Sequence, residues 1–371
     1  MKNKLLLTSA LASSLIAGSS AIAQTTITGD LVVNYRTQSF SGAGYTTASD
    51  KAKSVREIGR ESQLNVQNKG KLNVAGLDYA AGFSLEFDGQ GSAGGATTPA
   101  TERNTISNEN LFIDLISGNT TFTIGVDHIQ RNYAGATPQV TSVIDDINVA
   151  GAGTTFIIGA GTSEAAGIGL TQRVPQAGIS LSAYYVPKAG STGSYDAGAT
   201  PNDPGRNSAY EFTLLGSNTF GVKGLTVNAT YNKEAKSKHA VAAVGTGGTA
   251  GAAGANDTVG KMWGVGYNFG QFSIGYDRIN DVQGAITSTR TEETTNQYGV
   301  TFAATKDITV GALMYKTTKE GDAAKERVKA LQVGYNLGPV TAILSGAKVD
   351  NINYGANKDA EVVTARLSTK F

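Results

Sequence analysis

Few residues in this chain could carry bond chemistry. The sequence contains no cysteine, which excludes thiolate catalysis and disulfides, and only two histidines, His128 and His239. Both histidines fall in segments that we expect to be loops, and neither a G-x-S-x-G nor an H-E-x-x-H motif occurs. An enzyme is therefore the weaker hypothesis. We expect no cofactor and no metal site, because the oxygen-rich stretch 350–353 lacks the spacing of a calcium loop and is better read as a turn.

The remaining chemistry is electrostatic, and its clearest element is the acidic pair Asp145 and Asp146. Val143, Ile144 and Ile147 flank the pair, and such an apolar flank would hold the segment against a wall with both carboxylates in water. Fixed carboxylates beside a water-filled passage concentrate cations and repel anions. The alternative is that the two aspartates cap a loop turn, and the sequence leaves both readings open.

Strands must position these charges, because the hydrophobic pattern has a period of two almost everywhere after the first residues. At the C-terminus, Phe371, Leu367 and Val363 fall on one face, whereas Lys370 and Arg366 fall on the other. A strand with one apolar and one polar face suits a barrel whose outside meets lipid and whose inside meets water.

Short and long connections alternate along the chain, which is typical of an antiparallel transmembrane β-barrel with short periplasmic turns and long extracellular loops. Eight long loops give eight hairpins, and hence an all-β fold of sixteen strands. The long loops are 37–60, 89–108, 128–166, 187–209, 233–260, 279–296, 317–328 and 350–359. We expect strands near 25–36, 61–68, 77–88, 109–116, 121–127, 167–174, 179–186, 210–216, 225–232, 261–269, 272–278, 297–304, 308–316, 329–337, 340–349 and 360–371.

Two other β architectures fit less well. A soluble sandwich of this length would divide into domains, and no linker is evident. A β-helix would show a regular short repeat, which is also missing.

The first 23 residues have the pattern of a secretory signal: basic Lys2 and Lys4, an apolar stretch, and Ala21-Ile22-Ala23 as the cleavage site. Cleavage after Ala23 would leave residues 24–371 as one barrel. Without the two leader lysines, 29 Lys and Arg face 30 Asp and Glu. This balance gives nucleic-acid binding no support.

Strand parity predicts which side chains face the lumen. Among them the carboxylates outnumber the cations, which predicts a weak to moderate preference for cations. Arg56, Arg60 and Arg131 lie in or beside loops that could lean inward. The predicted wall residues are Asp30, Asn34, Arg36, Gln63, Asn65, Asp78, Glu86, Asp88, Asp114, Asp127, Arg173, Glu211, Asp277, Arg366 and Lys370.

A set of strand and turn segments recurs in a characteristic order along residues 24–371: Thr26 to Gly29, Ser62 to Val66, Leu77 to Phe87, Asn108 to Asp127, Ala183 to Tyr185, Tyr267 to Gly270, Tyr335 to Gly338, and the terminal Phe371. In this order the segments resemble the general (diffusion) porin family of Gram-negative outer membranes. Two departures remove positive charge that this family often carries, one at Gln63 and one at Gly125-Val126-Asp127.

The resemblance implies a homotrimer of barrels in the outer-membrane lipid, passing small hydrophilic solutes and ions without energy input. The third loop, 128–166, would fold inward as the constriction, and Phe371 would be the signal read by the barrel-assembly machinery. A substrate-specific channel for a sugar or small metabolite is the alternative, with Tyr184 as a rare inner-face aromatic. The candidate constriction residues are Asp145, Asp146, Asp127, Arg36, Arg60, Arg131 and Arg173.

Overall fold

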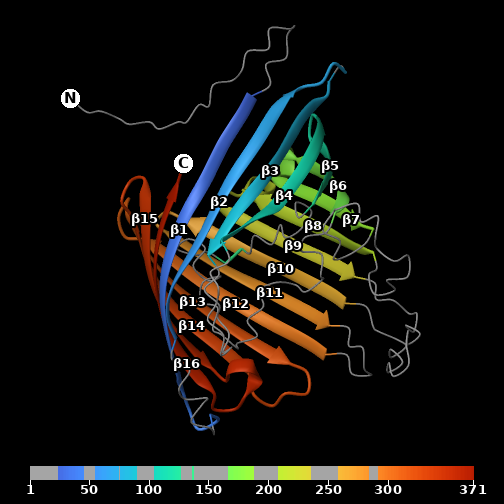
Figure 1. The fold of residues 1–371 in the computed structure, drawn as a ribbon. Helices are drawn as coiled ribbons and strands as arrows, with labels where there is room; N and C mark the ends of the chain where they lie inside the picture. The colour runs from blue at the N-terminus through green and yellow to red at the C-terminus, as the bar shows by residue number, and fades with distance from the viewer. Residues whose placement is uncertain are drawn as a thin grey trace, which may run out of the picture.

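The chain forms a closed antiparallel barrel of sixteen strands, in which each strand pairs with its sequence neighbours and β1 also pairs with β16 (Figure 1). This confirms the predicted fold class and strand number. The computed structural model describes residues 24–45, 55–74, 76–89, 104–126, 136–137, 166–187, 208–234, 258–283 and 291–371. No helix formed by these residues has the length and apolar composition needed to cross a membrane.

The strands extend further toward the long loops than the sequence predicts. The hydrophobic alternation fades there, but the backbone ladder continues, as where Ser41 still pairs with Asp359. The bounds are β1 Gln24–Ser41, β2 Val55–Lys71, β3 Asp78–Gly89, β4 Asn104–Ser117, β5 Thr120–Val126, β6 Ala166–Val174, β7 Ile179–Val186, β8 Ala209–Ser217, β9 Leu225–Glu234, β10 Thr258–Phe269, β11 Phe272–Gln283, β12 Thr291–Ala303, β13 Ile308–Lys319, β14 Glu326–Asn336, β15 Val340–Asp350 and β16 Asp359–Lys370.

The outer face of the barrel is apolar and exposed. On β16, Val363 and Leu367 are 49% and 53% exposed, whereas Val362 and Thr364 on the inner face are each 1% exposed. The predicted facing of this last strand is therefore confirmed. Exposed apolar side chains at every second strand position are what a barrel needs when lipid, and not a protein core, surrounds it.

Aromatic side chains form two rows on this outer face, across β10, β11 and β12. Phe269, Phe272 and Phe302 stack in succession near the short turns, with ring centroids 5.8 and 4.7 Å apart. Nearer the loops, Tyr276 and Tyr298 lie 5.1 Å apart. Rows of aromatic residues at two depths match the interfacial girdles of membrane barrels.

The C-terminal residue closes the ring. The Gly29 N–H donates to the Phe371 carbonyl at 2.9 Å, and the Phe371 N–H donates back to the Gly29 carbonyl at 3.0 Å. A Cβ at position 29 would lie 2.6 Å from the Phe371 ring, so glycine leaves the space that the ring occupies. Phe371 therefore has a structural role at the seam between β1 and β16.

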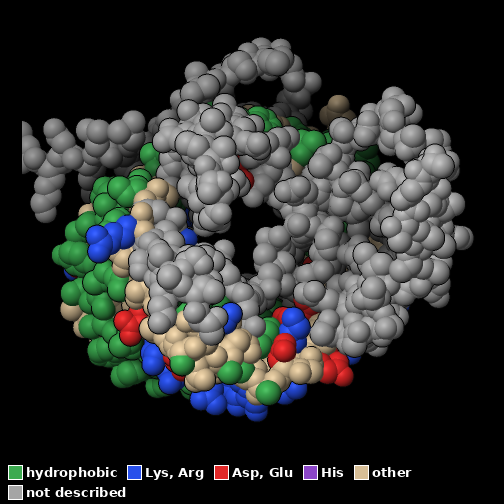
Figure 2. All heavy atoms as spheres, turned by 60° about the horizontal axis from the view of Figure 1, so that its bottom comes forward, with side chains coloured by type: hydrophobic (Ala, Val, Ile, Leu, Met, Phe, Trp, Pro, Cys, Tyr) green, Lys and Arg blue, Asp and Glu red, His purple; other side chains and the backbone are tan. Residues whose placement is uncertain are grey.

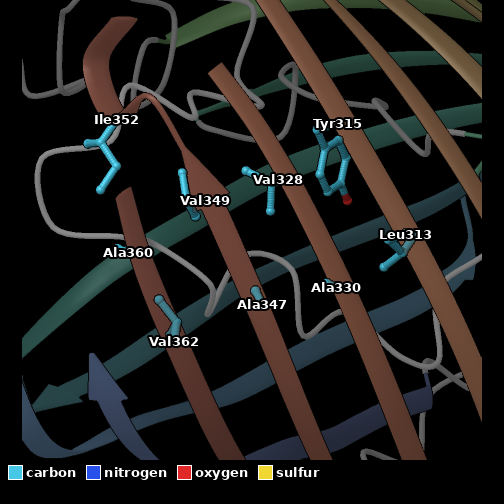
Figure 3. Close-up of a cluster of buried hydrophobic side chains, with 9 residues drawn as sticks. All are labelled: Leu313, Tyr315, Val328, Ala330, Ala347, Val349, Ile352, Ala360 and Val362. Carbon is cyan, nitrogen blue, oxygen red and sulfur yellow. The ribbon is translucent and has the colours of Figure 1, made fainter. Parts of the chain in front are cut away.

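One part of the inner face is apolar, which the sequence pattern did not predict. Near the loop end of β13 to β16, inward side chains form a buried cluster with Ile352 of the short 3₁₀ turn η3 (Ile352–Tyr354) (Figure 3). The lumen is therefore not uniformly polar. The cluster comprises Leu313, Tyr315, Val328, Ala330, Ala347, Val349, Ile352, Ala360 and Val362, with Phe40 packed against it.

Candidate channel and constriction

A segment of the third long loop is bound to the inner wall through Asp277 of β11. Within loop 128–166 the structure describes Ala136 and Thr137. The Ala136 N–H donates to Asp277 Oδ1 at 2.8 Å, and the Thr137 N–H donates to Oδ2 at 2.7 Å. The Thr137 hydroxyl also donates to Oδ2, and Asn228 Nδ2 donates to Oδ1 at 3.4 Å. Asp277 is 0% exposed, so its carboxylate serves as an anchor for the loop and does not face open water.

Two glycines of β10 make room for this anchor. A Cβ at Gly264 would lie 1.8 Å from Asp277 Oδ1. A Cβ at Gly266 would lie 2.5 Å from the Ala136 carbonyl oxygen. Side chains at either position would displace the aspartate or the loop, so the wall is shaped to receive residues 136–137.

A cavity of about 630 Å³ lies between this loop segment and the wall of β6 to β10. Arg173 is exposed, and its guanidinium group lines this cavity. Ser180, Thr226 and Asn268 add polar groups to the lining, beside Thr137. The cavity is large enough for a small hydrophilic solute, and its lining offers both hydrogen-bond donors and acceptors.

Cations and carboxylates share the walls of the barrel, since Asp30 and Arg36 both lie on β1 and Arg173 of β6 lies two strands from β8. Arg36 of β1 and Arg366 of β16 are on neighbouring strands, where Arg36 opposes Thr364 and Arg366 opposes Asn34. Glu211 lies on β8, half the ring away from β16. Fixed charges of both signs therefore line the passage around the ring.

Most predicted wall residues occupy strand positions that alternate with the exposed apolar ones. Asp30 Oδ1 accepts from the Gln63 N–H at 3.2 Å, and Asp114 Oδ1 accepts from Thr123 Oγ1 at 2.6 Å. Asn65 Nδ2 donates to Gln63 Oε1 at 3.4 Å. The residues so placed are Asp30, Asn34, Arg36, Gln63, Asn65, Asp78, Glu86, Asp114, Arg173, Glu211, Asp277, Arg366 and Lys370.

Arg60 requires a correction. The sequence placed it at the end of a loop, but β2 begins at Val55, so Arg60 lies within the strand. There it pairs with Val33, an outward-facing residue of β1. The side chain of Arg60 is outside the described part, whereas Arg56, opposite Thr37, is exposed.

Several predicted site residues lie outside the described residues. Among them are both members of the acidic pair and both histidines. The side chain of Asp88 is likewise outside the described part. The residues concerned are Asp127, His128, Arg131, Asp145, Asp146 and His239.

Tyr184 is buried against the wall instead of lining the passage. It is 8% exposed, and its ring fills the space above Gly169, where a Cβ would lie 2.2 Å from the ring. Its hydroxyl lies 3.3 Å from Thr171 Oγ1. An aromatic side chain in this state offers no sliding surface to a sugar.

The oxygen-rich stretch after β15 is occupied by turn interactions. Asp350 pairs with Lys348 at 3.4 Å, and Asn351 Oδ1 accepts from the Asn357 N–H at 3.0 Å. Burial, with Glu293 and Glu326 nearby, raises the pKa of Tyr354 in the adjoining turn. Within the described residues, no group of three or more acidic, histidine or cysteine side chains could hold a metal ion.

Sequence reasoning missed three features of this site: the loop contact at residues 136–137, and the receiving glycines Gly264 and Gly266. The glycines did leave a signal, because they occupy alternate positions on the inner face of an otherwise regular strand. Glycine inside a strand often marks the close approach of another backbone.

A ring of sixteen amphipathic strands around an opening, with a loop segment bound inside, defines a membrane channel (Figure 2). The profile of the Gram-negative porin family matches residues 8–368. The chain belongs to this family and is an outer-membrane channel protein. No curated protein matches the chain in sequence.

Solved structures share the fold at low sequence identity. OmpT of Vibrio cholerae is 14% identical, with 94% of this chain and 98% of that chain covered and a TM-score of 0.61. An anion-selective porin from Comamonas acidovorans is 13% identical, with 94% and 100% covered and a TM-score of 0.62. OmpF of Salmonella typhi, in complex with daunomycin, is 12% identical, with 94% and 97% covered and a TM-score of 0.59.

Proposed function

We propose that the chain forms a water-filled channel for passive diffusion of small hydrophilic solutes and ions across the outer membrane. The observation that carries this proposal is the binding of residues 136–137 to Asp277 inside the barrel. A loop fixed to the inner wall narrows a passage without closing it, and selection then depends on diameter and on fixed charge.

The channel prefers cations weakly. Asp30, Asp114 and Glu211 on the inner wall support this preference, and Asp145 with Asp146 would add to it at the neck. Asp277 contributes less than a free carboxylate, because loop amides surround it. A porin of similar fold from Comamonas acidovorans is anion-selective, so the sign of the reversal potential distinguishes this channel from that one.

We propose that loop 128–166 forms the neck opposite the wall, with Asp127, Arg131, Asp145 and Asp146 contributing charge from the loop side. Arg36, Arg173 and Arg366 would contribute from the wall, in keeping with their inner-face strand positions.

A substrate-specific channel remains the second candidate, and the 630 Å³ cavity beside Arg173 favours it. Such a cavity would retain a small anionic or sugar-like solute through its guanidinium and hydroxyl groups. The burial of Tyr184 weighs against the sugar-specific form of this hypothesis.

Three further proposals concern biogenesis and assembly. The chain is exported and cleaved after Ala23, and the barrel-assembly machinery reads Phe371. The mature chain assembles as a homotrimer, which is supported by a trimer form of Vibrio cholerae OmpT among the similar structures.

Planar-bilayer recording tests the proposed function. Current steps in groups of three, with a cation-selective reversal potential in a KCl gradient, would support an open trimeric channel. Anion selectivity would contradict the charge argument, and micromolar block by one sugar or anion would favour the specific channel. Replacing Asp145 and Asp146 by asparagine should shift the reversal potential toward anions; an unchanged value would remove both from the neck.

A further inference from the structure

The 630 Å³ cavity beside Arg173 extends from the loop contact at residues 136–137 to the short-turn end of the barrel. Arg173 lies two residues before the 3₁₀ turn η1 (Pro175–Ala177). Its N–H donates at 2.8 Å to the carbonyl of Asn119, which belongs to the short turn between β4 and β5. Asn268, which also lines the cavity, is close to the end of β10 that leads into another short turn. A solute in this cavity would therefore sit between the anchored loop and the short-turn mouth of the passage.

One row of the strand register links Arg173 to the loop anchor at Asp277. The two residues are five strand spacings apart, or roughly 20 Å across the curved wall. This distance exceeds the Debye length of about 8 Å at physiological salt, so the Asp277 carboxylate does not neutralise the guanidinium. Neighbouring strands pair along this row in the order Arg173, Ser180, Leu215, Asn228, Gly264 and Asp277.

The charge of Arg173 is available to a solute. Among the described residues that line the cavity, Arg173 is the one charged side chain, and it is exposed. No carboxylate in the described part of the chain forms an ion pair with it. Glu211 shares β8 with Leu215 but lies four residues away, or roughly 13 Å along the strand. The cavity therefore carries a local positive charge, although carboxylates occur elsewhere on the wall.

Apolar side chains supply much of the remaining lining. Leu215 faces the cavity directly beside Ser180 in the register, at a position where the inner wall is otherwise polar. Pro175 and Ile179 add apolar surface near the short turns. A single cation next to an apolar wall suits an organic anion with an apolar body, since ligand pockets combine apolar surface with a few placed polar groups.

We propose that this cavity is a binding site for small organic carboxylates, in which Arg173 and Ser180 hold the carboxylate and Leu215 contacts an apolar body such as a ring. The inference rests on the proposed function, because the site lies in the proposed passage. Arg173 and Ser180 oppose each other directly, and such pairs have Cβ atoms about 4.5–5.5 Å apart. One carboxylate can then accept from both side chains, with the guanidinium donating through two N–H groups. A small inorganic anion would use the guanidinium alone, and an uncharged ring would use the leucine alone.

Fluorine NMR of the folded, detergent-solubilised protein tests the proposal without depending on ion conduction. The probes are 4-fluorobenzoate and 4-fluorobenzamide, which have the same ring and differ in charge. Wild-type protein should bind the benzoate in preference to the benzamide. Arg173→Gln should raise the Kd for the benzoate about 10-fold or more, because a hydrogen bond to a charged group is lost.

Two variants and one competition serve as controls. Lys306→Gln removes a cation from another short turn, away from the cavity, and should leave the Kd unchanged. Arg173→Lys keeps the charge and should retain more affinity than Arg173→Gln, while heat-modifiable migration on gels shows that each variant is folded. Unlabelled benzoate should displace the fluorinated probe more effectively than acetate at the same concentration, because acetate lacks the ring that contacts Leu215.

Three results would overturn the proposal. The first is a Kd for Arg173→Gln within twofold of wild type. The second is equal binding of fluorobenzoate and fluorobenzamide by wild type. The third is displacement by acetate that matches displacement by benzoate, which would mean that the apolar wall has no part in binding.

Conductance in KCl without any probe, measured on the same preparations, separates this proposal from the proposed function. A conducting channel that does not bind fluorobenzoate would refute the carboxylate site and leave the diffusion channel intact. Binding by a protein that inserts into bilayers without conducting would refute the diffusion channel and support the site.

Discussion

Replacing Asp277 by asparagine should release the loop segment that lies inside the barrel. The Asp277 carboxylate accepts hydrogen bonds from the N–H groups of Ala136 and Thr137 on separate oxygens. It also accepts a hydrogen bond from the Thr137 hydroxyl. Asparagine has nearly the same shape but only one acceptor oxygen. Its amide nitrogen must then face at least one loop N–H, so donor meets donor in a site that is closed to water.

The expected magnitude follows from the number of bonds lost. A hydrogen bond to a charged group contributes about 1.5–3 kcal/mol, and the substitution removes one or two of them. The docked state of the loop should therefore lose about 1.5–6 kcal/mol, which raises the population of the released state roughly 10-fold to 20,000-fold. The strand ladder of the barrel is untouched, so global stability should change little.

Single-channel recording measures this change directly. Asp277→Asn channels should show more frequent closures and greater open-channel noise than wild type at the same voltage. Asp114→Asn is the matched control, because Asp114 bonds to Thr123 within the wall. The control should alter selectivity slightly and leave the closure rate unchanged.

The reasoning would be refuted if folded Asp277→Asn channels closed no more often than wild type. Folding is checked by heat-modifiable migration on gels, which reports barrel closure independently of the loop. An equal rise in closures for Asp114→Asn would also refute it, because the effect would then follow from removing any wall carboxylate.

Three further predictions concern the seam, the wall and the inner cluster. Gly29→Leu places a side chain where the Phe371 ring lies, so folding yields into vesicles should fall; an unchanged yield would show that the seam adapts. Arg36→Gln with Arg366→Gln removes two wall cations and should move the reversal potential further toward cation selectivity, and no movement would place both outside the ion path. Leu313→Ala should lower the free energy of unfolding by about 2–5 kcal/mol in urea titrations, because it empties a buried site; a loss below 1 kcal/mol would mean that the cluster collapses around it.

The alternating residues and the alternating short and long connections were enough to predict the barrel, its sixteen strands and the facing of most side chains. A period of two leaves two possible facings for each strand, and lipid outside the barrel selects the one with the apolar face outward. Strand ends were predicted less well, as Arg60 shows. The backbone ladder of β2 continues past the point where alternation stops, so a residue assigned to a loop lies in a strand.

The apolar cluster at the loop end of β13 to β16 was also beyond sequence reasoning. Val328 and Ala330 alternate with Arg327 and Lys329, so the pattern there is inverted, with apolar residues inside and charges outside. An alternating pattern read by itself does not state which face is the inner one. The pairing of β14 with its neighbours fixes that choice.

The sequence by itself determined the class of protein, because amphipathic strands with short and long connections can satisfy every backbone group in lipid only by closing into a barrel. Only the tertiary structure decided what holds the loop inside the barrel. The loop anchor joins Ala136 to Asp277, 141 residues apart. Contacts of this kind depend on register and loop path, and a list of residues in chain order contains neither.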